Sequence, residues 1–253
     1  MRDDIQSIDT IAFDDGPYPR GRIGFICVAN AGLTEGEMAR MAPPGVGLSF
    51  THMPMRTECT VESLAGMEAD LDATLAAFLP ARSDIDVLCY NCTAGSFVIG
   101  EDRISAKLSA HSSGARATTL LSGVRAALDA LGAETISLGT AYTADINDLE
   151  RRYFETAGIG IAALSGLGLM TDVEMNRVSP GYLRDFAISL DRSEADAIFL
   201  SCGALRSLDI VEEVEAATGK PVICSNQASF WHCLRLAGIE DRIGGFGQLF
   251  RCA

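Results

Sequence analysis

Two cysteines occupy equivalent places in two similar stretches of this chain. Residues 86–96 read DVLCYNCTAGS and residues 196–207 read DAIFLSCGALRS, so that Cys92 aligns with Cys202. Each cysteine follows a short apolar run typical of a strand buried on both faces, and small residues lead from it towards a helix. Amides at the start of a helix favour a thiolate, and open α/β folds bind ligands at such strand ends. Two opposed thiols could act as acid and base, or as nucleophile and proton donor.

The other cysteines and the histidines suggest no second reactive cluster. Cys89 and Cys92 form a Cys-x-x-Cys motif, which could be a redox pair or half of a zinc site, but Cys89 aligns with Phe199 and is predicted to pack in the core. A structural zinc needs about four Cys or His ligands, and no second such motif or close His pair occurs. The remaining candidates are predicted to be structural: His52, His111, His232, Cys27, Cys59, Cys224, Cys233 and Cys252. The glycine-containing strings match no nucleotide-binding fingerprint, so we expect neither a metal nor a cofactor.

Composition narrows the class of protein. The chain has 253 residues, 48% of them hydrophobic, and no apolar run near the roughly 18 residues that a membrane helix requires. Its acidic N-terminus does not resemble a signal peptide, and eight cysteines without an export signal predict reduced thiols in the cytoplasm. A formal net charge of -14 argues against nucleic acid or an anionic membrane as a partner. An anionic substrate would therefore have to be held by backbone amides, hydroxyls and amide side chains.

The pattern of elements repeats once. Residues 1–21 are predicted to be an N-terminal arm, and 101–114 a mobile connection. The first half is predicted to contain strands at 22–30, 46–53 and 86–91, with helices at 33–41, 60–79 and 118–132. The second half is predicted to contain strands at 134–142, 158–166, 196–201 and 220–227, with helices at 145–158, 180–191, 206–218 and 228–238.

The repeat predicts the architecture. The two cysteines lie about 110 residues apart, and the first strands of the two halves are offset by nearly the same amount. We therefore expect two similar Rossmann-like α/β lobes, residues 22–132 and 133–253, each with a parallel sheet wrapped by helices. The active site is expected in the cleft between the lobes, where both cysteine-bearing strand ends meet.

Several of these stretches resemble a known superfamily. The motifs NCTAGS, GARATTLLSGVRAALDALG, AYTADIN, SCGALRS and GKPVICSNQASFWHCLRLAG are similar to those of the aspartate/glutamate racemase superfamily. The resemblance lies in the branch of maleate cis-trans isomerases, arylmalonate decarboxylases and ectoine-utilisation proteins, and it covers nearly the whole chain after residue 20. It implies two lobes related by a pseudo-twofold axis, no cofactor, and one cysteine from each lobe in the cleft.

The resemblance also implies roles for individual residues. Cys92 and Cys202 match the two catalytic cysteines, whereas arylmalonate decarboxylases keep only the second, so the presence of both favours isomerase or racemase chemistry. Asp172 occupies the place of a substrate-binding Asn in maleate isomerases, and an acid there would repel a carboxylate unless protonated or turned away. The substrate-binding groups that the resemblance implies are Asn30, Thr93, Tyr142, Asp172 and the backbone near Gly203.

The predicted function is that of a cofactor-independent isomerase of a small carboxylic acid, similar to maleate cis-trans isomerase. Cys92 would add to the alkene carbon and Cys202 would protonate its neighbour. Rotation and elimination would then give the trans product. The alternatives are a racemase of amino acids or hydantoins, an ectoine-catabolism enzyme using both thiols as acid and base, and a non-catalytic binding module. A homo-oligomer, dimer or tetramer, is expected.

Overall fold

Two four-stranded sheets form the frame of the protein. The structure, a computed structural model, describes residues 11–112 and 114–252. The first sheet has the order β2-β1-β3-β4, with β1 (Gly21–Val28), β2 (Val46–Met53), β3 (Val87–Asn91) and β4 (Arg116–Thr119). The second has the order β6-β5-β7-β8, with β5 (Thr135–Thr140), β6 (Gly160–Gly166), β7 (Ala197–Ser201) and β8 (Val222–Cys224). All pairs are parallel and the two orders are equivalent, which confirms the predicted two-lobed α/β fold.

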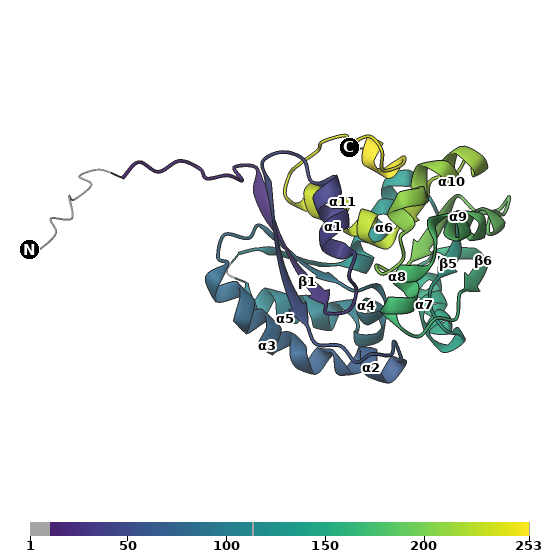
Figure 1. Ribbon diagram of the computed structural model, residues 1–253, viewed down its shortest axis with the longest axis horizontal. Coiled ribbons are helices and arrows are strands. Elements are labelled where there is room, and N and C mark those ends of the chain that lie inside the picture. The colour runs from purple at the N-terminus through teal and green to yellow at the C-terminus, as the bar shows by residue number, and fades with distance from the viewer. Residues whose placement is uncertain (1–10, 113, 253) are drawn as a thin grey trace, which may run out of the picture.

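Helices cover both sheets, as Figure 1 shows. Those of the first half are α1 (Thr34–Met41), α2 (Val61–Gly66), α3 (Glu68–Phe78), α4 (Thr93–Ile99), α5 (Glu101–His111) and α6 (Leu120–Leu131). Those of the second half are α7 (Ala144–Thr156), α8 (Asp172–Arg177), α9 (Pro180–Ser189), α10 (Val211–Thr218) and α11 (Ser225–Leu236). Short 3₁₀ turns lie at Leu79–Ala81, Ser207–Ile210 and Leu249–Arg251.

Helices α6 and α11 pack against each other in the middle of the molecule. The crossing is close because Gly123 has no side chain: a Cβ there would lie 2.9 Å from the carbonyl oxygen of Ala228. Helix α11 also contacts α1 and β3 of the first half, and its Phe230 ring lies 6.2 Å from that of Phe25. The last helix of the chain therefore joins the two halves, and its first residues lie beside the cysteine-bearing strand ends.

The structure corrects several of the sequence predictions, among them the strand predicted at 220–227, because residues 225–227 form the first turn of α11. The segment 101–114 was expected to be a mobile connection, but Glu101–His111 is helix α5; Ile104 and Leu108 are buried, and Arg103 and Lys107 pair with acids of α3. Only two large apolar residues mark that helix, so its periodicity is weak. The start of the predicted helix 118–132 is strand β4, whose Thr119 caps α6. The predicted helix 60–79 is interrupted at Met67, which ends α2 and begins α3, and the short α8 was not predicted.

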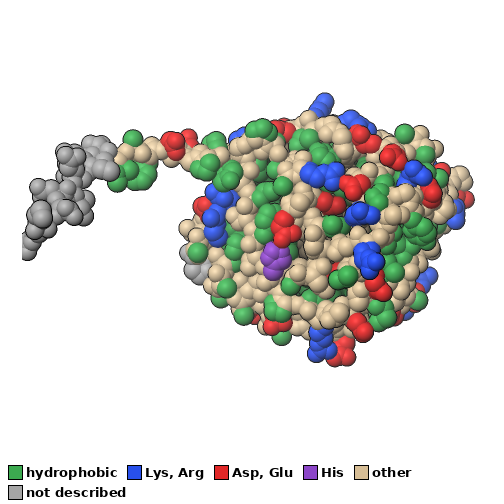
Figure 2. All heavy atoms as spheres, in the orientation of Figure 1, with side chains coloured by type: hydrophobic (Ala, Val, Ile, Leu, Met, Phe, Trp, Pro, Cys, Tyr) green, Lys and Arg blue, Asp and Glu red, His purple; other side chains and the backbone are tan. Residues whose placement is uncertain are grey.

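The N-terminal segment leaves the body of the protein. Residues 11–20 form no helix or strand, and the segment extends outwards in Figure 1 from the point where Tyr18 and Arg20 contact Arg22 and Asp241 of the body; the first ten residues of the predicted arm at 1–21 lie outside the described part. Acidic and basic side chains are interspersed over the face drawn in Figure 2. Across the described ranges, no helix is both long enough and apolar enough to cross a membrane.

Candidate active site

Cys92 lies at the junction of β3 and α4. It is the N-cap of α4, and its Sγ accepts a hydrogen bond from the Gly95 N–H at 3.3 Å. Glycine is required at position 95, because a Cβ there would lie 2.3 Å from the Tyr90 hydroxyl and 3.1 Å from the Cys92 Sγ. The buried Tyr90 hydroxyl has no hydrogen-bond partner in the described part of the chain, and its proximity to Cys92 lowers the pKa of that thiol. Cys92 is thus held by its own helix start and lies near a phenol from the preceding strand.

Cys202 occupies the equivalent place after β7, with a strained backbone. Its φ of 130° is the one positive value among the non-glycine residues that the structure describes. Such a conformation costs on the order of 1–3 kcal/mol and persists only where its surroundings impose it. The Cys202 N–H donates to Ser225 Oγ at 3.0 Å, and its Sγ accepts from the Ala204 N–H at 3.4 Å. Strain at this one position is typical of a functional site.

The two cysteines line a single narrow cavity. Its walls come from both halves of the chain: Val28, Ala31, Met55, Cys59, Leu64, Cys92, Thr93, Ala94, Tyr142, Asp172, Cys202, Gly203 and Ala204. Its free volume is about 30 Å³, room for roughly two water molecules. The loop after β2 closes onto the loop after β6, where the Cys59 N–H donates to the Met170 carbonyl at 2.6 Å. A substrate with several carbon atoms can enter only if these loops separate.

Burial controls the protonation of both thiols in this narrow cavity. It raises the pKa of Cys92 to about 12 and that of Cys202 well above its usual value. The nearby carboxyl of Asp172 raises both pKa values further, while backbone amides and the Tyr90 and Tyr142 hydroxyls lower them. The backbone amides favour the thiolates, as the sequence predicted, but loss of hydration outweighs them, so the pKa values of both thiols lie above the ordinary value.

The first residue of α11 bridges the two cysteine loops. Ser225 Oγ accepts from the hydroxyl of Thr93, at 2.9 Å, and from the N–H of Cys202, at 3.0 Å. The Thr93 hydroxyl, which the resemblance assigned to a substrate carboxylate, thus donates to Ser225 in this structure. The buried hydroxyl of Ser225 therefore fixes the distance between Thr93 and Cys202.

The next residue of α11 makes a second bridge. Asn226 Oδ1 accepts from the Asn91 side chain at 3.0 Å, and its Nδ2 donates to the Gly203 carbonyl at 2.9 Å and to Glu37 at 2.7 Å. A Cβ at Gly203 would lie 2.9 Å from Asn226 Oδ1, so only glycine fits there. Burial raises the pKa of Glu37 to about 7. Ser225 and Asn226 together hold both cysteine loops from behind.

Not all predicted site residues meet at the cavity. Cys92, Thr93, Tyr142, Asp172, Cys202 and Gly203 line it, whereas Asn30 does not, although Val28 and Ala31 on either side of it do. Asn30 Oδ1 is buried, with no hydrogen-bond partner in the described part of the chain. Sequence reasoning missed the roles of Tyr90, Ser225 and Asn226. Polar residues directly after the short strand VIC were the one available signal for the last two.

A second supporting contact lies behind Cys202. Glu150 of α7 is fully buried, and its Oε1 accepts from the hydroxyl of Ser201, the residue before Cys202, at 2.5 Å. Burial raises the pKa of Glu150 to about 8, so its carboxyl is protonated at neutral pH. A buried neutral acid can donate as well as accept a hydrogen bond, which suits a position with no counter-charge.

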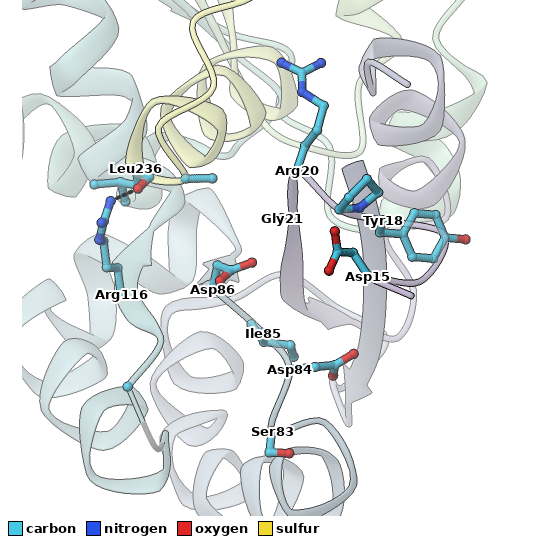
Figure 3. Close-up of a pocket in the computed structure, with 13 residues that line it drawn as sticks. Asp15, Tyr18, Arg20, Gly21, Ser83, Asp84, Ile85, Asp86, Arg116 and Leu236 are labelled. Atoms are coloured by element: carbon cyan, nitrogen blue, oxygen red, sulfur yellow. Dashed lines mark hydrogen bonds between the residues drawn. The ribbon is translucent and has the colours of Figure 1, made fainter. Parts of the chain in front are cut away.

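A larger hollow lies at the opposite, amino-terminal ends of the first sheet's strands. It has a volume of about 640 Å³ and is open and mostly polar (Figure 3). Most of its charged side chains are engaged: Arg20 pairs with Asp241, Arg116 donates to the Leu236 carbonyl, and Asp86 accepts from the Arg22 N–H. It holds no thiol, so its chemistry does not match that of the narrow cavity.

The remaining cysteines pack or stay unpaired. Cys89 is fully buried within β3, beside Ser229, which confirms the prediction of core packing. All eight cysteines are free thiols. Within residues 11–112 and 114–252, no cluster of three or more His, Cys, Asp or Glu side chains is arranged to hold a metal ion.

Comparison with known proteins gives consistent matches. The profile of the arylmalonate decarboxylase family matches residues 67–250. Arylmalonate decarboxylase of Bordetella bronchiseptica is 30% identical, covering 90% of this chain and 95% of that protein. Maleate isomerase of Nocardia farcinica is 28% identical, covering 91% and 95% respectively.

The solved structures agree with these matches. A mutant of the Nocardia farcinica maleate cis-trans isomerase with a covalently bound succinylcysteine intermediate is 25% identical to this chain. It superposes with a TM-score of 0.84 over 91% of this chain and 98% of its own. The matches confirm the resemblance to the branch that contains maleate isomerases and arylmalonate decarboxylases.

Proposed function

Because the chain belongs to the arylmalonate decarboxylase family, we propose that it is a cofactor-independent isomerase of a small carboxylic acid, acting through Cys92 and Cys202. The observation that carries the proposal is the pair of thiols, one from each half of the chain, in one narrow cavity. The maleate isomerase relatives support an isomerase role. The resemblance implies that arylmalonate decarboxylases keep only the second cysteine, so the presence of both here favours isomerisation over decarboxylation.

In the proposed mechanism the thiol pair carries one proton and one negative charge. The Cys92 thiolate forms a bond to one alkene carbon, and the electron pair of the double bond takes the proton of Cys202 at the neighbouring carbon. The single bond then rotates, the Cys202 thiolate removes a proton, and Cys92 leaves as thiolate. The charge and the proton return to their starting places, so no cofactor is consumed.

The site supplies groups for the other steps. The first N–H groups of a helix have no intrahelical partner; that of Gly95 donates to the Cys92 sulfur, and those at the start of α4 that do not donate to this sulfur could hold a carboxylate beside it. The Tyr142 hydroxyl lies beside Cys202, where it lowers the pKa of that thiol. Because burial holds the pKa of Cys92 at about 12, the thiolate forms rarely at neutral pH. We therefore expect kcat/KM to rise with pH through the neutral range.

Adduct formation tests the assignment of roles. We assign attack to Cys92, since the hydroxyl-bearing Thr93 follows it, and proton delivery to Cys202, which is followed by Gly203 and Ala204. Substrate incubated with Cys202→Ala should leave a thioether adduct on Cys92, detectable by mass spectrometry, whereas Cys92→Ala should form none. Cys89→Ala is the matched control, because that cysteine is buried in the same strand and does not line the cavity.

Other results would reverse or replace the assignment. An adduct on Cys202 in the Cys92→Ala protein would exchange the two roles. Turnover with solvent deuterium incorporation but no adduct in any variant would instead identify a racemase that uses both thiols as acid and base. If no small carboxylic acid gives turnover or an adduct, the remaining function is that of a binding module.

Location and assembly are part of the same proposal. We place the enzyme in the cytoplasm, where its eight free thiols would stay reduced. The proposed assembly is a dimer or tetramer. The proposed ligand is a small carboxylate rather than nucleic acid or a membrane, because the net charge of the chain is -14.

A further inference from the structure

Asp172 lines the cavity and has an unpartnered, buried carboxylate oxygen. The residue is 7% exposed, lines the cavity, and is the one charged residue among the described residues of the cavity wall. Its Oδ2 is buried with no hydrogen-bond partner in the part of the chain that the structure describes. Orphaned buried acceptors are rare, because leaving one unpaired costs free energy.

The carboxyl of Asp172 is not occupied by capping its own helix. Thr171 is the N-cap of α8, its Oγ1 accepts from the Glu174 N–H at 3.3 Å, and Glu174 Oε2 accepts from the Thr171 N–H at 3.1 Å. This reciprocal pair satisfies the helix start without Asp172. Oδ2 of Asp172 therefore stays unpaired in this structure, although its residue lines the cavity.

Asp172 also acts on the reactive groups. It raises the pKa of Cys92, Cys202 and Cys59, and no Lys, Arg or His is present among the described lining residues to offset it. A second substrate carboxylate placed here would face a like charge at low effective dielectric. A hydrogen-bond donor placed here would satisfy Oδ2 and weaken the contribution of Asp172 to the raised pKa values of both thiols, which burial chiefly causes.

We propose that Asp172 makes the enzyme selective for a monocarboxylic acid whose second polar group donates hydrogen bonds, a primary amide or an ammonium, over a dicarboxylate. The proposal rests on the isomerase function above and names its substrate class. Sites built to pair a polar group discriminate strongly against an analogue that leaves that group unpaired. The carboxylate end of the substrate would lie at the cysteine loops, and the donor end at Asp172.

The test compares maleate with its monoamide in the wild type and in Asp172→Asn. At pH 7.5 the wild type should convert the monoamide with a kcat/KM at least tenfold that for maleate. Asparagine offers a donor to a carboxylate, so the ratio should fall at least tenfold in the variant, equivalent to about 1.4 kcal/mol. Asp102→Asn, an exposed acid in the first turn of α5, is the matched control and should keep the wild-type ratio.

A binding readout separates this proposal from the isomerase function. Succinate and its monoamide lack the alkene, so their protection of Cys92 against iodoacetamide reports binding alone. The monoamide should protect wild type at a concentration at least tenfold lower than succinate, and the difference should vanish in Asp172→Asn.

The outcomes are distinct. Preferential protection by the monoamide without turnover of either alkene would overturn the isomerase function and leave the selectivity standing. Turnover with a wild-type preference for maleate, or with a ratio that Asp172→Asn does not change, would overturn the selectivity and leave the isomerase standing. If the protein turns over neither alkene and none of the four compounds protects Cys92, both the isomerase function and the selectivity are overturned.

Discussion

Replacing Ser225 by Ala should uncouple the two cysteine loops while leaving both thiols in place. The Ser225 hydroxyl accepts from the Cys202 N–H and from Thr93, and it is 1% exposed. Its removal leaves a buried N–H unpaired, which costs about 1–3 kcal/mol of unfolding free energy. Because Cys202 is held at a φ of 130°, the loop is then expected to relax towards an ordinary conformation and move its sulfur. A displacement of about 1 Å can reduce a rate by on the order of 100-fold.

The measurement separates positioning from stability. Urea unfolding should show a loss of about 1–3 kcal/mol in Ser225→Ala, and kinetics should show kcat reduced by roughly 10- to 100-fold with a smaller change in KM. Ser122→Ala is the matched control: it removes a hydroxyl from the first turn of α6, the helix equivalent to α11, which donates to Glu101 at 2.6 Å. Ser122→Ala should lose similar stability and keep its kcat.

A conservative variant completes the test. Ser225→Thr retains the hydroxyl and should recover most of the activity that Ser225→Ala loses. If Ser225→Ala keeps a kcat within threefold of wild type, or if Ser122→Ala loses as much, the hydroxyl of Ser225 does not position Cys202 and the reasoning fails.

Three further predictions concern Glu150, Tyr90 and the removal of metal ions. Burial raises the pKa of Glu150 from 4.5 to about 8, so its contribution to stability is complete below pH 4.5 and is lost as pH rises through 8. Glu150→Gln can still accept from Ser201 and should flatten the fall in unfolding free energy between pH 5.5 and 8.5. An unchanged slope would contradict the assignment. Tyr90→Phe should shift the pH profile of Cys92 alkylation upwards by roughly 0.7 unit, the equivalent of a hydrogen bond of about 1 kcal/mol, whereas an identical profile would show that the hydroxyl does not act on the sulfur. Activity should survive exhaustive EDTA treatment, and its loss with recovery on adding zinc would refute the thiol mechanism.

Local patterns in the sequence determined the repeat and the positions of the two cysteines. The apolar runs before Cys92 and Cys202 are short and bounded, and small residues follow each, so strand ends were predicted at both places and the structure has them there. The weakly marked α5 and the four-residue β4 were mispredicted, because each carries too few apolar residues to establish a period.

Only the tertiary structure decided how the site is held and charged. Nothing local in the sequence places Ser225 and Asn226 behind Cys92, since that contact spans more than half of the chain and depends on the crossing of α6 and α11 at Gly123. The pKa values of the thiols could not be predicted from their helix starts either. A helix amide acts over one turn, whereas desolvation depends on how many atoms of both lobes exclude water from the cavity, and that number is fixed only when the lobes have packed.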